Sequence, residues 1–449
     1  MIDAEILETS RMDEPDVELL ADLLRHELLD VFGYREGGPP AAAPSEGALP
    51  RTAMGWAVVT GEQTEPYHQW VVRVENAGST TSTGVAGEHV DLAGHDSQSR
   101  VYADLPEGEA SSRRRKDALA GQVADQAVSA DIYITERPYL LAESTWNHLE
   151  VPVMTTVQAI GPIGLYLRAQ DEFLLAHNIS VDRAGFYFLA TRELLPESWR
   201  WFSAAVRHSQ HTNDGSFEAL AGSLLDRVSR AIEARDAIHV ALNQRPLSGH
   251  GADLVRSLDT FLLFLMGASD VAARVAHHVL ELGGSGRSAG WQRERWLDKV
   301  AAQCPDLATV VSPDTPAWHA LRILSELRNT VHGEAIRGLA IMSRTGPIST
   351  AVRIPRGQLR EILPSVVELG GAHAWGLASN GPDGTLADAE IFVDGLLNHL
   401  MPVLNELMRR TPVELLPGSN MQPEDAYPPT DKPFYSERNR TRTRLQLGL

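Results

Sequence analysis

The fold class is decided by the stretch KDALAGQVADQAVSADIYITERPYLLAESTWNHLEVPVMTTVQAIGPIGLYLRAQDEFLLA (residues 116–176). Its apolar periodicity predicts a helix, a strand at 131–135, a second helix, a strand at 151–155 and a third helix. Strands that alternate with helices in this way are typical of a parallel sheet covered by helices. The sequence therefore predicts an α/β domain in the N-terminal part of the chain.

The residues before this stretch contain further elements. Apolar side chains recur at helical spacing over 15–32, and the Gly/Pro-rich segment 37–50 is typical of a linker. Two runs rich in β-branched residues, at 55–61 and 69–75, predict strands. The polar Ser/Thr/Gly-rich segment 78–112 indicates a long loop.

The chain becomes mainly helical from about residue 196 onward. Long amphipathic segments predict helices at 216–243, 252–282, 289–303, 315–333, 356–369 and 388–411. Short strands are expected at 338–344, 349–355 and 374–379. We therefore expect an α/β domain at 1–190, a helical domain with a small β insertion at 191–430, and a basic tail at 431–449.

The composition of the chain excludes several classes of protein. The chain has 449 residues and a formal net charge of −19, which disfavours a protein that coats nucleic acid by bulk electrostatics. Its longest apolar run, 260–267, is too short to span a bilayer, and no secretory signal is evident. The single cysteine, Cys304, excludes an internal disulfide, so we expect a cytoplasmic protein. The basic runs 113–116 and 436–446 indicate a solvated loop and a disordered end.

One short polar segment, SELRNTVHGE (325–334), lies at the end of a predicted helix. At about 100° per residue, Arg328 and His332 fall on the same face as Leu321 and Leu324. An unpaired arginine on an apolar face costs several kcal/mol. Such a residue therefore serves an anionic partner, a protein interface or a phosphate.

A structural explanation of the same pair stays open. Arg328 can form an ion pair with Glu326 or with a carboxylate on a neighbouring helix, and His332 can cap the end of its own helix. A pair of this spacing occurs often by chance.

The segment LRNTVHG resembles the signature of the HEPN family (higher eukaryotes and prokaryotes nucleotide-binding), over about residues 216–412. The resemblance implies a helical bundle that forms a homodimer with two motifs face to face, and that cuts RNA without a metal or another cofactor. It implies that His332 exchanges protons with the ribose 2′-OH, that Arg328 holds the phosphate, and that Asn329 orients the pair. Three residues separate Arg328 and His332 here, whereas four to six are commoner in the family.

The α/β stretch resembles the PIN-like nuclease domains. Asp117 matches an aspartate that opens an alanine-rich helix, and Thr135–Glu136 match the end of the next strand. The resemblance implies that Asp117 and Glu136 bind Mg²⁺ or Mn²⁺ against a phosphate. The first acid of the family follows an N-terminal strand, and Asp3 and Glu62 are poor substitutes for it. The alternative is that Asp117 only caps a helix and Glu136 lies on the surface.

The two resemblances together predict an RNA-cleaving endoribonuclease of the toxin or phage-defence type, with RNA as its partner, a cyclic phosphate product and no membrane association. The alternative is a module that keeps both folds, binds nucleotides or proteins, and has lost catalysis. The Arg–His spacing and the missing first acid favour the alternative, whereas the placement of both residues on an apolar face favours the enzyme.

Overall fold

The computed structural model describes residues 1–8, 11, 13–38, 54–76, 79–142, 149–176, 179–243, 250–330, 336–341, 349–381 and 384–448. The chain forms two compact units. The first comprises Met1–Val181 together with Thr441–Leu449, and the second comprises Asp182–Arg440. No helix in the described ranges is both long and apolar enough to cross a lipid bilayer.

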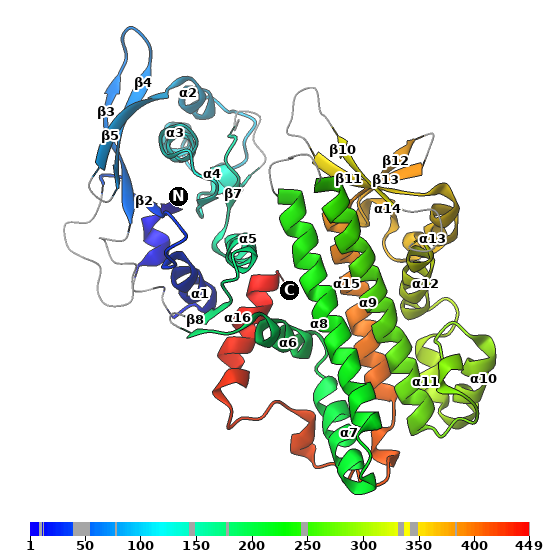
Figure 1. Ribbon diagram of the computed structural model, residues 1–449. Coiled ribbons are helices and arrows are strands. Elements are labelled where there is room, and N and C mark those ends of the chain that lie inside the picture. The colour runs from blue at the N-terminus through cyan, green and yellow to red at the C-terminus, as the bar shows by residue number, and fades with distance from the viewer. Residues whose placement is uncertain are drawn as a thin grey trace. The chain divides into compact units, whose positions relative to one another are not determined.

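The first unit is built around a sheet that helices flank (Figure 1). Its elements in chain order are β1 (Ile2–Asp3), η1 (Ala4–Leu7), α1 (Pro15–Leu24), β2 (Phe32–Tyr34), β3 (Gly55–Gln63), β4 (Gln69–Asn76), β5 (Ser79–Ala86), α2 (Glu88–Gly94), α3 (Glu107–Gln122), η4 (Val123–Val128), β6 (Tyr133–Ile134), α4 (Pro138–Leu141), β7 (Val153–Met154), α5 (Thr156–Ala169), β8 (Leu174–Ala176) and β9 (Ile179–Ser180).

The sheet is parallel at its centre. Its strand order in the described residues is β5-β4-β3-β2-β1-β6-β7, and the strands from β3 to β7 in this order run parallel. Strands β4 and β5 extend the β3 edge in antiparallel fashion. The parallel sheet predicted from residues 116–176 is confirmed. The loop predicted at 78–112 is wrong, because β5 pairs along its whole length with β4 and so satisfies its polar backbone.

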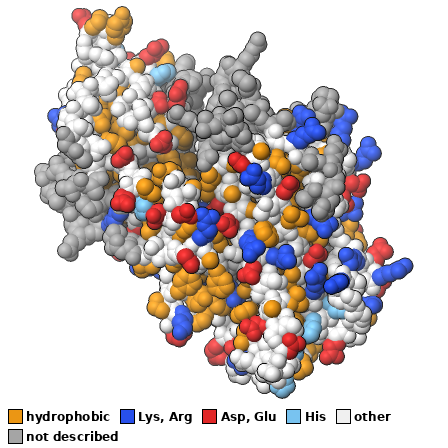
Figure 2. Space-filling model, in the orientation of Figure 1, with side chains coloured by type: hydrophobic (Ala, Val, Ile, Leu, Met, Phe, Trp, Pro, Cys, Tyr) orange, Lys and Arg blue, Asp and Glu red, His pale blue; other side chains and the backbone are white. Residues whose placement is uncertain are grey.

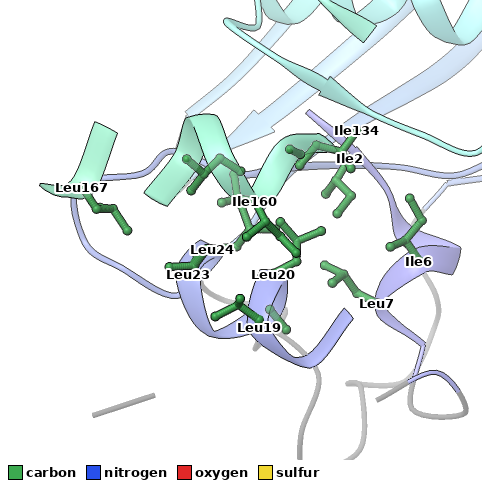
Figure 3. Packing of buried hydrophobic residues seen from close by; sticks show 14 residues of the cluster. Ile2, Ile6, Leu7, Leu19, Leu20, Leu23, Leu24, Ile134, Ile160 and Leu167 are labelled. Atoms are coloured by element: carbon green, nitrogen blue, oxygen red, sulfur yellow. The ribbon is translucent and has the colours of Figure 1, made fainter. Parts of the chain in front are cut away.

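Alternate residues of the central strands supply the two faces of the core. Ile2 and Ile134 lie in the hydrophobic cluster that α1 and α5 cover. Their neighbours Met1 and Tyr133 lie in the cluster of the opposite face, to which α3 and α4 contribute. This alternation with a period of two is what a β-strand dictates. Figure 3 shows the first cluster, in which leucines of α1 pack near Ile2 of β1 and Ile160 of α5.

The C-terminal part of α16 (Glu437–Leu447) belongs to the first unit. Arg442 is only 1% exposed, and its guanidinium forms ion pairs with Asp22 (2.7 Å) and Glu18 (3.0 Å) of α1. The disordered basic end predicted from composition is therefore wrong, because ion pairs from buried Arg442 to the buried Asp22 and the half-buried Glu18 hold the helix in place. The solvated loop predicted at 113–116 is also wrong, since these residues lie within α3.

The second unit is mainly helical. Its elements are α6 (Arg183–Leu194), α7 (Ser198–Thr212), α8 (Ser216–Asn243), α9 (His250–Val279), η5 (Gly286–Ser288), α10 (Glu294–Gln303), α11 (Pro305–Val310), α12 (Pro316–Asn329), β10 (Arg337–Ile341), β11 (Ser349–Ile354), α13 (Arg356–Glu368), α14 (Gly371–Ala374), β12 (Leu377–Gly381), β13 (Gly384–Asp388), α15 (Ala389–Arg410), η6 (Val413–Leu415), η7 (Pro423–Ala426), η8 (Pro433–Tyr435) and the start of α16.

The long helices α8, α9 and α15 run side by side (Figure 1). The six helices predicted from apolar periodicity correspond to α8, α9, α10, α12, α13 and α15, so a mainly helical second part is confirmed. The predicted β insertion is an antiparallel sheet, whose strand order in the described residues is β10-β11-β13-β12. Strand β13 was not predicted.

A polar cluster joins α8 to α15 inside the helical unit. Asp394 accepts hydrogen bonds from Arg235 Nε (2.6 Å) and from His239 Nε2 (3.0 Å). Burial alone would raise the pKa of Asp394, but the hydrogen bonds from His239 and Arg235 outweigh burial and hold the pKa at about 2. This carboxylate therefore stabilises the fold in its ionised form.

Candidate functional site

Arg328 lies at the C-terminal end of the apolar face of α12. The helix begins where the side chain of Thr315 accepts a hydrogen bond from the backbone N–H three residues on (3.1 Å). Leu321 and Leu324 are buried, as the helical wheel predicts, and Arg328 follows them as a half-buried residue. The predicted position of Arg328 on the apolar face is confirmed.

Arg328 lines a pocket of about 160 Å³ that α8, α9 and α12 enclose. The charged residues of its lining are Arg227 of α8, Asp270 and Arg274 of α9, and Arg328 itself. Within the described part of the chain, none of these arginines forms an ion pair. The alternative pairing with Glu326 is absent, because Glu326 faces Arg322 at 3.4 Å.

Arg227 lies against the backbone of α9. A β-carbon at Gly267 would collide with Nη1 of Arg227, so glycine at this position leaves room for the guanidinium where it now lies. Arg227 Nε is buried and has no hydrogen-bond partner in the described residues. A buried donor without a partner is unfavourable, and a bound anion would supply that partner.

Asp270 does not neutralise the pocket. Burial raises the pKa of Asp270, whereas the positive charges of neighbouring arginines, led by Arg274 and Arg328, act in the opposite direction. Three arginines and one aspartate give the lining a net positive charge whether or not the aspartate is ionised. The pocket therefore attracts anions, although the whole chain carries −19.

The other residues of the predicted motif lie at or beyond the end of α12. Asn329 is the last residue of the helix and is exposed. His332 lies outside the described residues, so its predicted proximity to Arg328 stays a prediction.

A second candidate site lies in the first unit, at the carboxyl ends of β1 and β6. The chain adds β2 and β3 on one side of β1, and β6 and β7 on the other, so strand order reverses between β1 and β6. Ligands of open α/β sheets bind at such a switch point. Asp3 ends β1, and Thr135 follows β6. Asp3 therefore does end an N-terminal strand, although the sequence indicated that it was a poor substitute for such an acid.

Arg137 occupies the centre of this site. Its Nε donates to Asp3 Oδ2 at 3.0 Å, and its Nη1 lies 3.3 Å from Asp117 Oδ1. Asp3 also accepts hydrogen bonds from the hydroxyls of Tyr133 (2.8 Å) and Thr135 (2.5 Å). Burial raises the pKa of Asp117, and Arg137 is among the groups that oppose this effect. One guanidinium thus balances two carboxylates that are each at most 5% exposed.

Asp117 and Glu136 do not share a site. Asp117 accepts a hydrogen bond from Tyr102 (2.8 Å), whereas Glu136 forms a bidentate pair with Arg11 (3.0 and 3.1 Å).

In the described ranges, no group of three or more histidine, cysteine, aspartate or glutamate residues is arranged to hold a metal ion. Arg137 supplies positive charge between Asp3 and Asp117, where a cation would have to bind, so this arrangement does not fit Mg²⁺ or Mn²⁺. Metal binding at Asp117 and Glu136 stays a prediction.

Sequence reasoning missed several residues of both sites. Gly267, Asp270 and Arg274 are spaced by three and four residues, so a helical wheel of α9 would have placed them on one face. Arg227 could not be linked to Arg328 in this way, because about a hundred residues separate them. Arg137 follows a predicted strand end, but no sequence signal indicates that it bridges two aspartates.

No family model, curated protein or solved structure matches the chain.

Proposed function

We propose that the helical unit binds RNA through its backbone phosphates and cleaves it at the pocket around Arg328. The observation that supports this most is the group of three arginines around one small pocket, none of which has an ion pair in the described residues. At about 160 Å³ the pocket is smaller than the roughly 300–1,000 Å³ of typical small-molecule sites. A phosphate group suits its size and its charge.

The proposed mechanism gives the arginines an electrostatic role. A guanidinium presents several N–H donors in a fixed plane and can donate two hydrogen bonds to one phosphate. Donors fixed in place stabilise the negative charge that develops on the phosphate as the 2′-OH attacks it. His332 would remove the proton of the 2′-OH, and Asn329 would orient the reacting groups, as the HEPN resemblance implies. As the 2′-oxygen bonds to phosphorus, the bond from phosphorus to the 5′-oxygen would break, and protonated His332 would return its proton to that leaving oxygen.

The distribution of charge sets limits on RNA binding. Over the helical unit, the face drawn in Figure 2 carries both positive and negative side chains. With −19 for the whole chain, long-range attraction to a polyanion is unfavourable. Recognition therefore rests on a few phosphates in the pocket. This predicts a salt dependence that corresponds to few released counterions.

A homodimer belongs to the same proposal. The HEPN resemblance implies two motifs that face each other across a twofold axis. Leu263 lines the Arg328 pocket and is 40% exposed, so apolar surface is available beside the site. Light scattering of the full chain at micromolar concentration should give twice the monomer mass, and a monomer would argue against a composite site.

The test of catalysis is RNA cleavage in the presence of EDTA. The wild type should cut single-stranded RNA, leave a 2′,3′-cyclic phosphate, and spare DNA of the same sequence, which lacks the 2′-OH. His332→Ala and Arg328→Ala should lower the rate by about 10²–10⁴. The matched control is Arg230→Ala, an exposed arginine of α8 that stacks on Phe264 outside the pocket. Cleavage unaffected by Arg328→Ala would refute the proposal.

A module without catalysis remains the second candidate function. The observation that favours it is the bridging of Asp3 and Asp117 by Arg137, which leaves the α/β unit without an available pair of carboxylates at its switch point. RNA binding that depends on Arg328, together with no cleavage by the wild type, would select this alternative.

A further inference from the structure

A second pocket of the helical unit lies where α6 and α7 meet the segment that follows η7. Its volume is about 610 Å³, within the range of sites for small molecules. Arg192 lines it from the last turn of α6, and Trp199 and Phe202 line it from α7. None of these residues belongs to the Arg328 pocket.

Arg192 is a buried cation without an anionic partner. It is 3% exposed, and in the described part of the chain its guanidinium forms one hydrogen bond, from Nη1 to Ser198 Oγ (3.1 Å). Its Nε is buried and unpaired. Burial lowers the pKa of Arg192 to about 10. Placing a charge in this environment without a counter-ion is unfavourable unless a ligand or the surrounding rings compensate it.

Three aromatic rings surround the guanidinium but carry no negative charge. The guanidinium carbon lies 4.3 Å from the ring centre of Trp199, 5.1 Å from that of Phe188 and 5.3 Å from that of Phe202. Tyr435 contacts Trp199 edge-on at 4.9 Å and fixes its orientation. These rings leave the in-plane donor Nε of Arg192 free for an acceptor. They also offer flat apolar surface to a planar ligand.

The lining of the pocket also contains acidic side chains. Glu424, Asp425 and Asp431 line it, and Asp425 is paired with Arg207 at 2.7 Å. Tyr427, which is 68% exposed, adds another ring. A strongly charged anion such as a phosphate monoester would be repelled here, whereas a monoanion with an apolar body would be repelled less.

We propose that this pocket binds a small planar organic monoanion of the aromatic carboxylate class. The carboxylate pairs with Arg192, and the ring lies against Trp199 and Phe202. This site is separate from the RNA site, and it would make the helical unit responsive to a small molecule.

The test uses the full chain and three probes that share one ring system. Titration calorimetry should show binding of 1-naphthoate. Binding of neutral 1-naphthamide should be about 10- to 100-fold weaker, because it lacks the charge-assisted hydrogen bonds to the guanidinium. Doubly charged 1-naphthyl phosphate should bind more weakly than the carboxylate at low salt, and the difference should shrink as salt is added. Equal affinity for carboxylate and amide, or no binding of 1-naphthoate, would overturn the proposal.

Substitutions of pocket residues test whether 1-naphthoate binds in this pocket. Arg192→Met should weaken 1-naphthoate binding about 10- to 100-fold, and the control Arg230→Met, which also removes an arginine stacked on an aromatic ring, should leave it unchanged. If Arg192→Met lowers the melting temperature too far for titration, the substitution Tyr427→Ala at an exposed position tests the proposal instead. Tyr427→Ala should keep the melting temperature and weaken the carboxylate and the amide alike, because it removes ring contact only. Unchanged affinity in Tyr427→Ala or in a folded Arg192→Met would overturn the proposal.

Discussion

Replacing Arg137 with Met should destabilise the first unit because it leaves two buried carboxylates without a cation. Asp3 and Asp117 are 5% and 4% exposed, and Arg137 pairs with them at 3.0 and 3.3 Å. In this variant both carboxylates keep their hydrogen bonds from hydroxyl groups, but in the described residues neither keeps an ion pair. Breaking one partner out of a buried ion pair costs about 3–5 kcal/mol, and we expect a loss of this size.

The matched control is Arg11→Met. Arg11 also pairs with carboxylates, Glu14 at 2.9 Å and Glu136 at 3.0 Å, but the pairs lie at the surface. Exposed ion pairs contribute about 0–1 kcal/mol, so this variant should be nearly as stable as the wild type. The contrast between the two variants isolates burial as the cause.

The assay has to measure the free energy of unfolding of the first unit separately, because a chain with two units need not unfold in one step. Hydrogen exchange of the peptides covering 131–142, measured as urea is raised, meets this requirement. The triple variant that adds Asp3→Asn and Asp117→Asn to Arg137→Met should recover part of the lost stability, since it removes the unpaired charges. A loss below about 1 kcal/mol for Arg137→Met, or a triple variant no more stable than the single one, would refute the reasoning.

Three further predictions follow from other contacts. The stability difference between the wild type and Asp394→Asn should be about 2 kcal/mol above pH 4 and should vanish toward pH 2 in urea melts, because the pKa of Asp394 in the folded state, about 2, lies below its unfolded value. Arg442→Met should cost about 1.5–3 kcal/mol by hydrogen exchange of α1, because buried Asp22 keeps its ion pair with Arg25 while the half-buried Glu18 loses its partner, and an unchanged exchange rate would contradict this. Gly267→Ala should displace Arg227 and weaken RNA binding without lowering the melting temperature by more than about 4 °C, as measured by fluorescence anisotropy and scanning fluorimetry.

The parts of the fold that the sequence predicts well are the long amphipathic helices. The helix predicted at 216–243 has the same bounds in the structure, because its apolar face recurs over many turns. Strand β1 was missed, since two residues carry no periodicity and pairing with β2 and β6 makes them a strand. Asp3 was set aside for that reason.

In the candidate sites, too, features within one helix could be predicted from the sequence, whereas contacts between distant segments could not. The position of Arg328 on an apolar face followed from helical geometry within a single helix. Its neighbours Arg227 and Arg274 come from other helices, and no local pattern links segments so far apart in sequence. Asp117 contacts Arg137 and Glu136 contacts Arg11, a difference that depends on tertiary packing and that no local pattern indicates.

The central claim is that the Arg328 pocket binds RNA phosphate, and the most direct measurement is the anisotropy of labelled single-stranded RNA as a function of salt. The account predicts that Arg328→Ala weakens binding about 10- to 100-fold and lowers the slope of log affinity against log salt by about 0.7, one phosphate contact. The control Arg230→Ala should behave as the wild type. Equal affinity and equal slope for the wild type and Arg328→Ala would contradict the claim.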